Sequence, residues 1–266
     1  MHQSVLDRFV DFTAPLEGVV PSLYVDVKQL LTVGIGCLVD PVSLALSLPW
    51  VMPDGSPASQ SEIATQWRKV KADAARLSKL HWKYAAKLTT MRLTDEGVLA
   101  VARGRLLANE KIMRGHFPNW DLFPADAQLA CCSMSWAIGA DWPRIFGNMK
   151  AACNAQNWTA AIASCAIRTE GNPGIVPRNA ANKLCLANAQ QVLAQGLPLD
   201  TLFWPGTAPS SSQRDDALRV EAEQAAVDHS ERLNAITAAL DVAGHAGRDI
   251  ADYENGPNPP NDPEIA

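Results

Sequence analysis

Residues 19–39 are the one part of the sequence that convincingly predicts β structure, and they lie near the start of a chain that otherwise favours helices. Two segments within this stretch, Leu23–Asp26 and Leu31–Gly36, are rich in β-branched residues and are separated by a polar turn, which is the pattern of a hairpin or small sheet. The sequence therefore predicts an α+β, helix-dominated fold with one small β-sheet.

Helix boundaries are marked by capping and breaking residues. Pro15 limits how far the first helix, which begins near Ser4, continues as a regular one. The capping-box pattern from Ser59 to Glu62 opens a long helix, and Gly196 stops the last one. The expected helices lie at about 4–12, 62–88, 94–114, 125–138, 144–155, 158–167 and 177–195.

The chain is long enough for one large domain with an appendage. It has 266 residues, of which 47% are hydrophobic, and eight of them are Trp, so it can bury a sizeable core. Residues 1–196 are expected to form the domain. A linker and an acidic helical appendage are expected at 197–254, and a disordered tail with four prolines at 255–266.

The sequence shows no membrane or export signal. No apolar stretch reaches the roughly 18 residues that span a bilayer, so no membrane insertion is expected. Asp7 and Asp11 interrupt the N-terminal region where a signal peptide needs an unbroken apolar core. We therefore expect a protein made in the cytoplasm without a general export signal.

The net charge of −5 is divided unevenly along the chain. Residues 1–196 carry 19 Lys and Arg against 15 Asp and Glu, whereas residues 197–266 carry 4 against 13. The basic excess is concentrated at 62–114, which favours an anionic polymer as partner, with ordinary solvated helix faces as the alternative. The whole-chain pI of 5.5 argues against nucleic acid as that partner.

The six cysteines have no CxxC spacing and no His at metal-ligand spacing, so no metal site is expected. Five of them lie within expected helices or beside apolar residues, where a reduced Cys behaves as a small hydrophobe. Disulfides formed after export are the alternative. The six are Cys37, Cys131, Cys132, Cys153, Cys165 and Cys185.

Three short motifs around the β region contain the residue types that glycoside hydrolysis needs. Cleaving a glycosidic bond takes a proton donor for the leaving oxygen and a second carboxyl that deals with an oxocarbenium-like centre. Glu17, which leaves an apolar helix, is the candidate for a carboxyl with a raised pKa, and Asp26 is placed to stay ionised. The motif residues, in chain order, are Glu17, Gly18, Tyr24, Asp26, Thr32, Gly34 and Gly36.

In order, spacing and context, these motifs resemble those of the phage-type lysozymes, glycoside hydrolase family 24. The resemblance covers about residues 4–192, although residues 41–92 match poorly and are expected to be an enlarged helical insertion. It implies a lysozyme-like fold with the small sheet at the active-site cleft. It also implies a cofactor-free muramidase that cleaves the β-1,4 bond between N-acetylmuramic acid and N-acetylglucosamine in bacterial peptidoglycan, with inversion at the anomeric carbon.

The resemblance also implies roles for individual residues. Glu17 is then the general acid, and Asp26 activates or positions a water that the hydroxyl of Thr32 holds. Gly34 and Gly36 let the backbone approach the sugar closely or aim the side chain of Thr32. Tyr24, from the same motif, is expected to support the site.

Two more residues belong to the expected site, and two positions depart from the family pattern. Arg178 falls where the family commonly has an Arg that pairs with the catalytic Glu, with an exposed first-turn Arg as the alternative. Trp136 is expected in the core, with a sugar-stacking ring as the alternative. Cys37 stands where many phage lysozymes have a His that makes a structural ion pair, and Pro15 precedes Glu17 by two residues.

A second class of function competes with the enzyme. A protein with the lysozyme fold that binds peptidoglycan or another partner without catalysis would use the acidic C-terminal part as its working surface. A wall hydrolase without an export signal needs either a membrane-permeabilising partner, as phage endolysins do, or a secretion machine that delivers it as an antibacterial effector to the periplasm. The second route implies an immunity protein as a partner, and the appendage slightly favours it.

Overall fold

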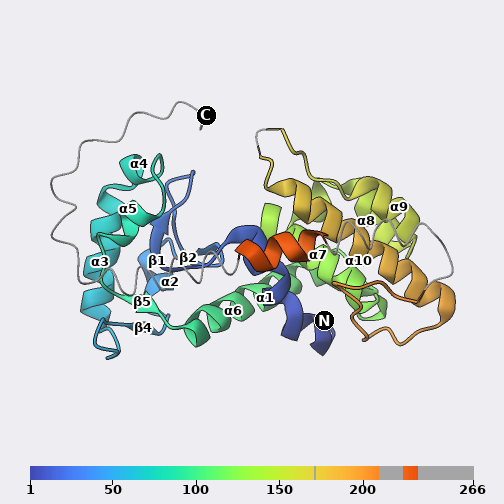
Figure 1. Cartoon of the computed structure of the whole chain (residues 1–266), viewed down its shortest axis with the longest axis horizontal. Helices are drawn as coiled ribbons and strands as arrows, with labels where there is room; N and C mark the ends of the chain where they lie inside the picture. The colour runs from blue at the N-terminus through green and yellow to red at the C-terminus, as the bar shows by residue number, and fades with distance from the viewer. Residues whose placement is uncertain (171, 210–223, 233–266) are drawn as a thin grey trace.

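The computed structural model describes residues 1–170, 172–209 and 224–232 and has a helix-dominated α+β fold, which confirms the predicted class (Figure 1). The helices are α1 (Gln3–Glu17), α2 (Val42–Leu46), α3 (Gln60–Ala72), α4 (Ala74–Leu77), α5 (Lys83–Ala86), α6 (Asp95–Arg114), α7 (Ala125–Ile138), α8 (Gly147–Asn154), α9 (Trp158–Ser164) and α10 (Ile175–Gln195), with short 3-10 turns at Trp120–Leu122 and Trp142–Arg144. The strands are β1 (Val20–Val25), β2 (Leu31–Gly34), β3 (Cys37–Leu38), β4 (Trp50–Val51) and β5 (Arg92–Leu93). Residues 224–232 are also helical.

The larger sheet has the strand order β1-β2-β3 and is antiparallel throughout. Tyr24 on β1 lies opposite Thr32 on β2, and Thr32 in turn lies opposite Leu38 on β3. Directly opposed residues of an antiparallel pair project to the same face of a sheet. The side chains of Tyr24 and Thr32 therefore share one face.

The expectation of a single sheet is wrong, because β4 and β5 form a second antiparallel pair. Trp50 lies opposite Leu93, and Val51 lies opposite Arg92. Each strand has only two residues, too few to show the alternation of apolar and polar residues that marks a strand in a sequence. Trp50 and Leu93 are buried, so tertiary packing brings these strands together.

The sheets and the later helices occupy different sides of the molecule. In Figure 1, α2–α5 gather around the sheets on one side, and α7–α10 lie on the other. The long helix α6 joins them, since it packs against β2, β3 and β5 and also against α7. Because α1 packs against α6, α7 and α10 and leads directly into β1, its C-terminal end lies at the junction of the two sides.

Most of the predicted helix ends are confirmed. Ser59 and Glu62 make both hydrogen bonds of a capping box at the start of α3. The side chain of Thr94 accepts a hydrogen bond from the backbone N–H of Gly97 at the start of α6. Gly196 ends α10 in the left-handed conformation, with φ of 62°, where glycine carries no steric penalty.

One expected helix is broken, and another continues past a proline to Glu17, where the first helical segment was expected to close. The helix expected at 62–88 is broken after Ala72 into α3, α4 and α5, because Asp73 leaves the helical conformation with φ of −108° and ψ of 15°. In contrast, α1 continues through Pro15 to Glu17. Proline removes one backbone donor, but Pro15 lies only two residues from the helix end and is buried in the core, so packing offsets the missing bond.

Helix α7 is the buried centre of the side formed by α7–α10. All its residues from Ala125 to Trp136 are buried, and α1, α6 and α10 pack against it. Many of its side chains are small (Ala, Ser or Cys), which lets the neighbouring helices approach closely. All six cysteines of the chain are free and buried, as expected of reduced thiols that act as small hydrophobes.

Residues 197–209, which were expected to begin a linker, pack on the domain. The carboxylate of Asp126 on α7 accepts hydrogen bonds from the backbone N–H groups of Phe203 and Trp204. The ring of Trp204 lies 5.0 Å from that of Phe12 on α1, between centroids. The compact part of the chain therefore extends past the expected boundary at 196. The predicted tail at 255–266 and most of the predicted acidic helix lie outside the described residues.

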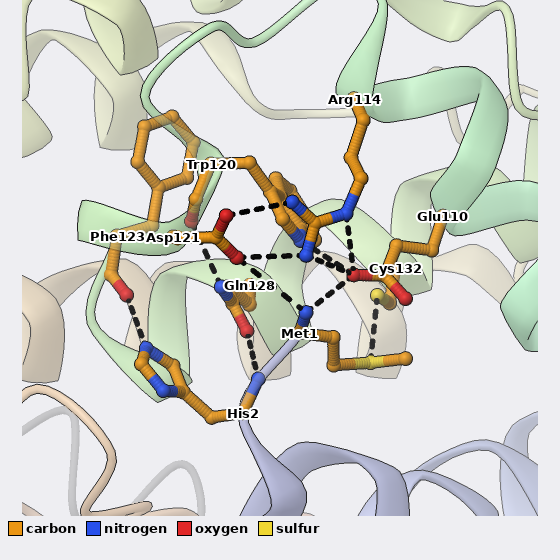
Figure 2. Close-up of polar contacts among 9 residues, drawn as sticks. All are labelled: Met1, His2, Glu110, Arg114, Trp120, Asp121, Phe123, Gln128 and Cys132. Carbon is orange, nitrogen blue, oxygen red and sulfur yellow. Dashed lines mark hydrogen bonds and ion pairs between the residues drawn. The ribbon is translucent and has the colours of Figure 1, made fainter.

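The start of the chain is tied to α6 and α7 through a cluster of polar contacts (Figure 2). The buried ammonium group of Met1 forms an ion pair with Glu110, which also accepts hydrogen bonds from Arg114 and from the indole N–H of Trp120. Although burial opposes it, the charge and hydrogen bonds of these donors lower the pKa of Glu110. The cluster fixes where α1 begins, and so helps to fix where it ends.

Candidate active site

Glu17 is the last residue of α1, and its carboxyl lies at the junction of the two sides of the molecule. The helix ends at Gly18, which has φ of 78° and whose N–H donates to the carbonyl oxygen of Ala14 at 2.7 Å. The side chain of Glu17 is 29% exposed. The carboxyl is therefore partly withdrawn from water while still open to a ligand.

Arg178, in the first turn of α10, holds this carboxyl. Its Nη2 donates to Oε1 of Glu17, and its Nη1 donates to the side-chain and backbone oxygens of Ser133 on α7, at 3.0 and 3.2 Å. Arg178 is only 1% exposed. The ion pair implied by the resemblance is therefore present, and the alternative of an exposed arginine is wrong. Because the guanidinium is itself held by Ser133, its bond to Glu17 fixes the position of the carboxylate.

Burial decides the pKa of Glu17. Removal of the carboxyl from water raises its pKa, and this effect outweighs the nearby positive charges of Arg178 and Arg105, which lower it. The sequence-based expectation of a raised pKa is confirmed in direction. A carboxyl with a raised pKa retains its proton to higher pH, as a general acid requires.

Asp26 follows β1 directly and shapes the turn into β2. Its Oδ1 accepts hydrogen bonds from the backbone N–H groups of Lys28 and Leu30, both at 2.8 Å. Thr32 lies on β2 and is 5% exposed, and its hydroxyl donates to the carbonyl oxygen of Leu30 at 3.3 Å. A hydroxyl that donates one bond still has lone pairs that can accept a bond from water.

The hydroxyl of Tyr24 interacts electrostatically with the carboxyls of both Glu17 and Asp26. Burial raises the pKa of this hydroxyl, and the neighbouring acidic groups of Glu17, Cys37 and Asp26 raise it further. The hydroxyl therefore stays protonated and is a hydrogen-bond donor in the neighbourhood of both Glu17 and Asp26. The structure thus brings Glu17, Tyr24 and Asp26 into one neighbourhood, with Thr32 on the same sheet face as Tyr24.

Gly36, between β2 and β3, lies close to the Glu17 carboxyl. It has φ of 74°, a conformation that favours glycine, and a Cβ at this position would lie 3.6 Å from Oε2 of Glu17. Gly34 has φ of 65°, and a Cβ there would lie 3.5 Å from the side chain of Val98. The two glycines let the turn after β2 pack between Glu17 and α6.

Trp136 supports the site from inside the core. It is 4% exposed, its indole N–H donates to the carbonyl oxygen of Ile35 at 3.0 Å, and its ring lies 5.0 Å from that of Phe9. A ring enclosed in this way has no open face for a sugar. The core prediction is confirmed, and the stacking alternative is wrong.

Arg105 on α6 is a member of the site that sequence reasoning missed. It donates a hydrogen bond to the carbonyl oxygen of Gly36, and its guanidinium lies 4.6 Å from the centroid of the Trp136 ring. In the sequence it is one of many basic residues between 62 and 114, and no motif distinguishes it. The one available signal is Cys37, whose identity leaves the turn after β2 without the ion pair expected there.

A hollow in the described part of the molecule lies apart from these residues. It has a volume of about 670 Å³ and lies between the end of α1, the start of α10 and the helical residues 224–232. Leu16 and Pro177 contribute to its lining, whereas their neighbours Glu17 and Arg178 do not. We therefore place the chemistry at Glu17, where the charged groups converge.

No family model and no curated protein matches the chain. Within the described residues, no helix has the length and apolar character needed to cross a membrane. In the same part of the chain, no group of three or more His, Cys, Asp or Glu side chains is arranged to hold a metal ion.

Proposed function

We propose that the protein is a muramidase with a lysozyme-like fold, which hydrolyses the β-1,4 bond between N-acetylmuramic acid and N-acetylglucosamine in peptidoglycan. The observation that carries the proposal is the partly buried Glu17, whose pKa is raised and whose carboxyl is held by Arg178 next to the sheet that bears Asp26 and Thr32. The resemblance of the sequence motifs to those of phage-type lysozymes supports the same chemistry.

In the proposed reaction Glu17 is the general acid. It protonates the leaving glycosidic oxygen, and its raised pKa keeps a larger fraction of the carboxyl protonated at mildly acidic pH. Arg178 fixes the orientation of the carboxyl. Since a positive charge favours the ionised form, the contribution of Arg178 to catalysis is positional.

Asp26 and Thr32 would activate and position the attacking water. Asp26 accepts the proton of the water as it attacks the anomeric carbon, and the Thr32 hydroxyl positions the water for this step. An inverting mechanism needs the two carboxyl groups roughly 6.5–9.5 Å apart, so that a water fits between them and the sugar. The backbone hydrogen bonds to Oδ1 hold the Asp26 carboxylate in place on the turn.

Product analysis tests the proposal. Purified peptidoglycan is treated with the protein, reduced with borohydride and examined by mass spectrometry. A muramidase releases disaccharide-peptides whose reducing end is muramic acid, so the reduced products contain muramitol. Products that end in reduced glucosamine would assign the cleavage to the other glycosidic bond, and sedimentation with the wall without release of products would support the binding-protein alternative.

The pH dependence of activity follows from the state of Glu17. The general acid must be protonated, so activity should fall on the alkaline side as the pH rises through the pKa of Glu17. Burial raises this pKa above its ordinary value of 4.5, so the alkaline limb should lie above pH 4.5. Initial rates across the pH range, with the fold monitored by circular dichroism, measure the limb. A limb at or below pH 4.5 would contradict the assignment.

Delivery to the wall is part of the proposal. We propose that the protein acts in the periplasm of a host or target bacterium, where it arrives either through a permeabilised membrane or through a secretion machine. Exposed basic side chains on and between α3 and β5 suit the anionic wall polymers found there, among them Arg68, Lys69, Lys79, Lys83 and Arg92. Expression in a Gram-negative host tests the site of action, since an added export signal should cause lysis that cytoplasmic expression does not.

A further inference from the structure

The turn between β2 and β3 is clamped between α6 and α7. Its residues Ile35 and Gly36 present their carbonyl oxygens to two different helices: the oxygen of Ile35 accepts from Trp136 on α7, and the oxygen of Gly36 accepts from Arg105 on α6. The Arg105 guanidinium also lies over the Trp136 ring, at 4.6 Å from its centroid. The two side chains that hydrogen-bond to the turn therefore also contact each other through a cation–π interaction.

The clamped turn lies close to the carboxyl of the candidate general acid. A Cβ on Gly36 would lie 3.6 Å from Oε2 of Glu17 and 3.9 Å from the indole nitrogen of Trp136. A movement of the turn by about 1 Å would therefore change the space beside the carboxyl. Misplacement on this scale is enough to lower turnover about 100-fold.

We infer that Arg105 is a positioning residue of the active site, which holds the Ile35–Cys37 turn beside the Glu17 carboxyl. The inference rests on the proposed function only for its effect on turnover, because the position of the turn and the environment of Glu17 can be measured without substrate.

Arg105 also contributes to the charge around Glu17. The charged and titratable groups that act on this carboxyl come from four elements: Arg178 on α10, Arg105 on α6, Tyr24 on β1 and Cys37 on β3. Burial raises the pKa of Glu17, and the two arginines lower it. Loss of the Arg105 charge should therefore shift the titration of Glu17 to higher pH.

Two variants test the inference against a matched control. Arg105→Gln removes both the charge and the planar guanidinium. Arg105→Lys keeps the charge, but an ammonium group lacks the planar arrangement of N–H donors and the flat surface with which the guanidinium contacts the Trp136 ring. The control is Arg103→Gln, two residues away on α6, where the arginine is half exposed and pairs with Asp7 at 2.9 Å. Unfolding in urea establishes that each variant is folded under the assay conditions.

Two measurements need no substrate. The titration of Glu17 is followed by NMR of protein with ¹³C-labelled glutamate carboxyls, with Glu17→Gln to assign the signal. The opening of the turn is followed by the rate at which a thiol reagent labels Cys37, which is 1% exposed, with the labelled cysteine identified by mass spectrometry. Arg105→Gln should raise the Glu17 midpoint and, through easier local opening, speed Cys37 labelling about ten-fold, although loss of Arg105 also raises the pKa of this thiol and so lowers its thiolate fraction. Arg105→Lys should leave the midpoint near the wild-type value and speed labelling less.

The outcomes separate this inference from the proposed function. If Arg105→Gln matches the Arg103→Gln control in titration, labelling and turnover, the positioning role is overturned, whether or not the wild type hydrolyses peptidoglycan. If titration and labelling respond but the wild type releases no products, the positioning role stands and the proposed function fails. If both stand, kcat of Arg105→Gln should fall about 10- to 100-fold with a smaller change in KM.

Discussion

Replacing Glu17 with Gln is expected to lower the rate of peptidoglycan hydrolysis by about 10³-fold. The amide has nearly the same shape as the carboxyl but carries no acidic proton, so the leaving sugar would depart without protonation. General acid catalysis contributes about 10²- to 10⁴-fold in enzymes, and glycosidases depend on it heavily because an unprotonated sugar oxygen leaves poorly. Initial rates of release of soluble disaccharide-peptides measure the loss.

The fold around Glu17 should survive this substitution. The amide oxygen of Gln can still accept the hydrogen bond from Nη2 of Arg178, and the Ser133 contacts of that arginine are unaffected. The buried guanidinium loses its counter-charge, however, so thermal unfolding of Glu17→Gln must be measured beside its rate. Glu96→Gln, at an exposed position in the first turn of α6, is the matched control. Hydrolysis by Glu17→Gln at the rate of the control would refute Glu17 as the acid.

Replacing Asp126 with Ala is expected to lower the free energy of unfolding by about 3 kcal/mol. Asp126 is fully buried on α7, and its carboxylate accepts hydrogen bonds from the side chain of Asn188 at 2.9 Å and from the N–H groups of Phe203 and Trp204 at 2.8 and 3.1 Å. Alanine would leave these donors without their acceptor, and each buried unsatisfied donor costs about 1–3 kcal/mol. Urea unfolding measures the loss. The control is Asp200→Ala, at an exposed position within residues 197–209. This change should alter the free energy of unfolding by less than about 0.5 kcal/mol.

The same residue should make stability depend on pH. Burial raises the pKa of Asp126 to about 6 from an ordinary value of 3.8, against the opposing effect of its three hydrogen-bond donors. Between these two values the folded state binds the proton more tightly than the unfolded state does. The contribution of Asp126 to stability therefore falls as the pH rises from about 4 to about 6, and the Ala variant should lack this component. An unchanged pH dependence in Asp126→Ala would contradict the raised pKa.

Local signals in the sequence predicted the parts of the fold that depend on neighbouring residues. The capping box at Ser59, the cap at Thr94 and the stop at Gly196 act within one helical turn, and each is found where it was expected. Between residues 125 and 195, the predicted helices agree with the observed ones to within three residues at each end. The β4–β5 pair was not predicted, because it depends on packing against distant residues, whereas the end of the first helix at Glu17 was expected.

The candidate site shows the same division. Glu17, Asp26 and Thr32 lie close together in the sequence, and together with Gly18, Tyr24, Gly34 and Gly36 they form the motifs that resemble those of phage-type lysozymes. Arg178 is 161 residues from Glu17, and only the resemblance to phage-type lysozymes suggested that the two would meet. Arg105 had neither a motif nor a counterpart in that resemblance, since its contacts with Gly36 and Trp136 arise from the packing of α6 against the sheet and α7.

The burial of all six thiols makes the surface of this protein available for selective chemistry. A cysteine introduced at an exposed position would be the accessible thiol among seven, so a maleimide dye could be attached without first removing the native cysteines. Val27, 83% exposed on the turn after β1, and Ile145, 75% exposed between α7 and α8, offer such positions on the two sides of the molecule. Energy transfer between dyes at these positions would report, in solution, whether the two sides move relative to each other when a glycan strand is added.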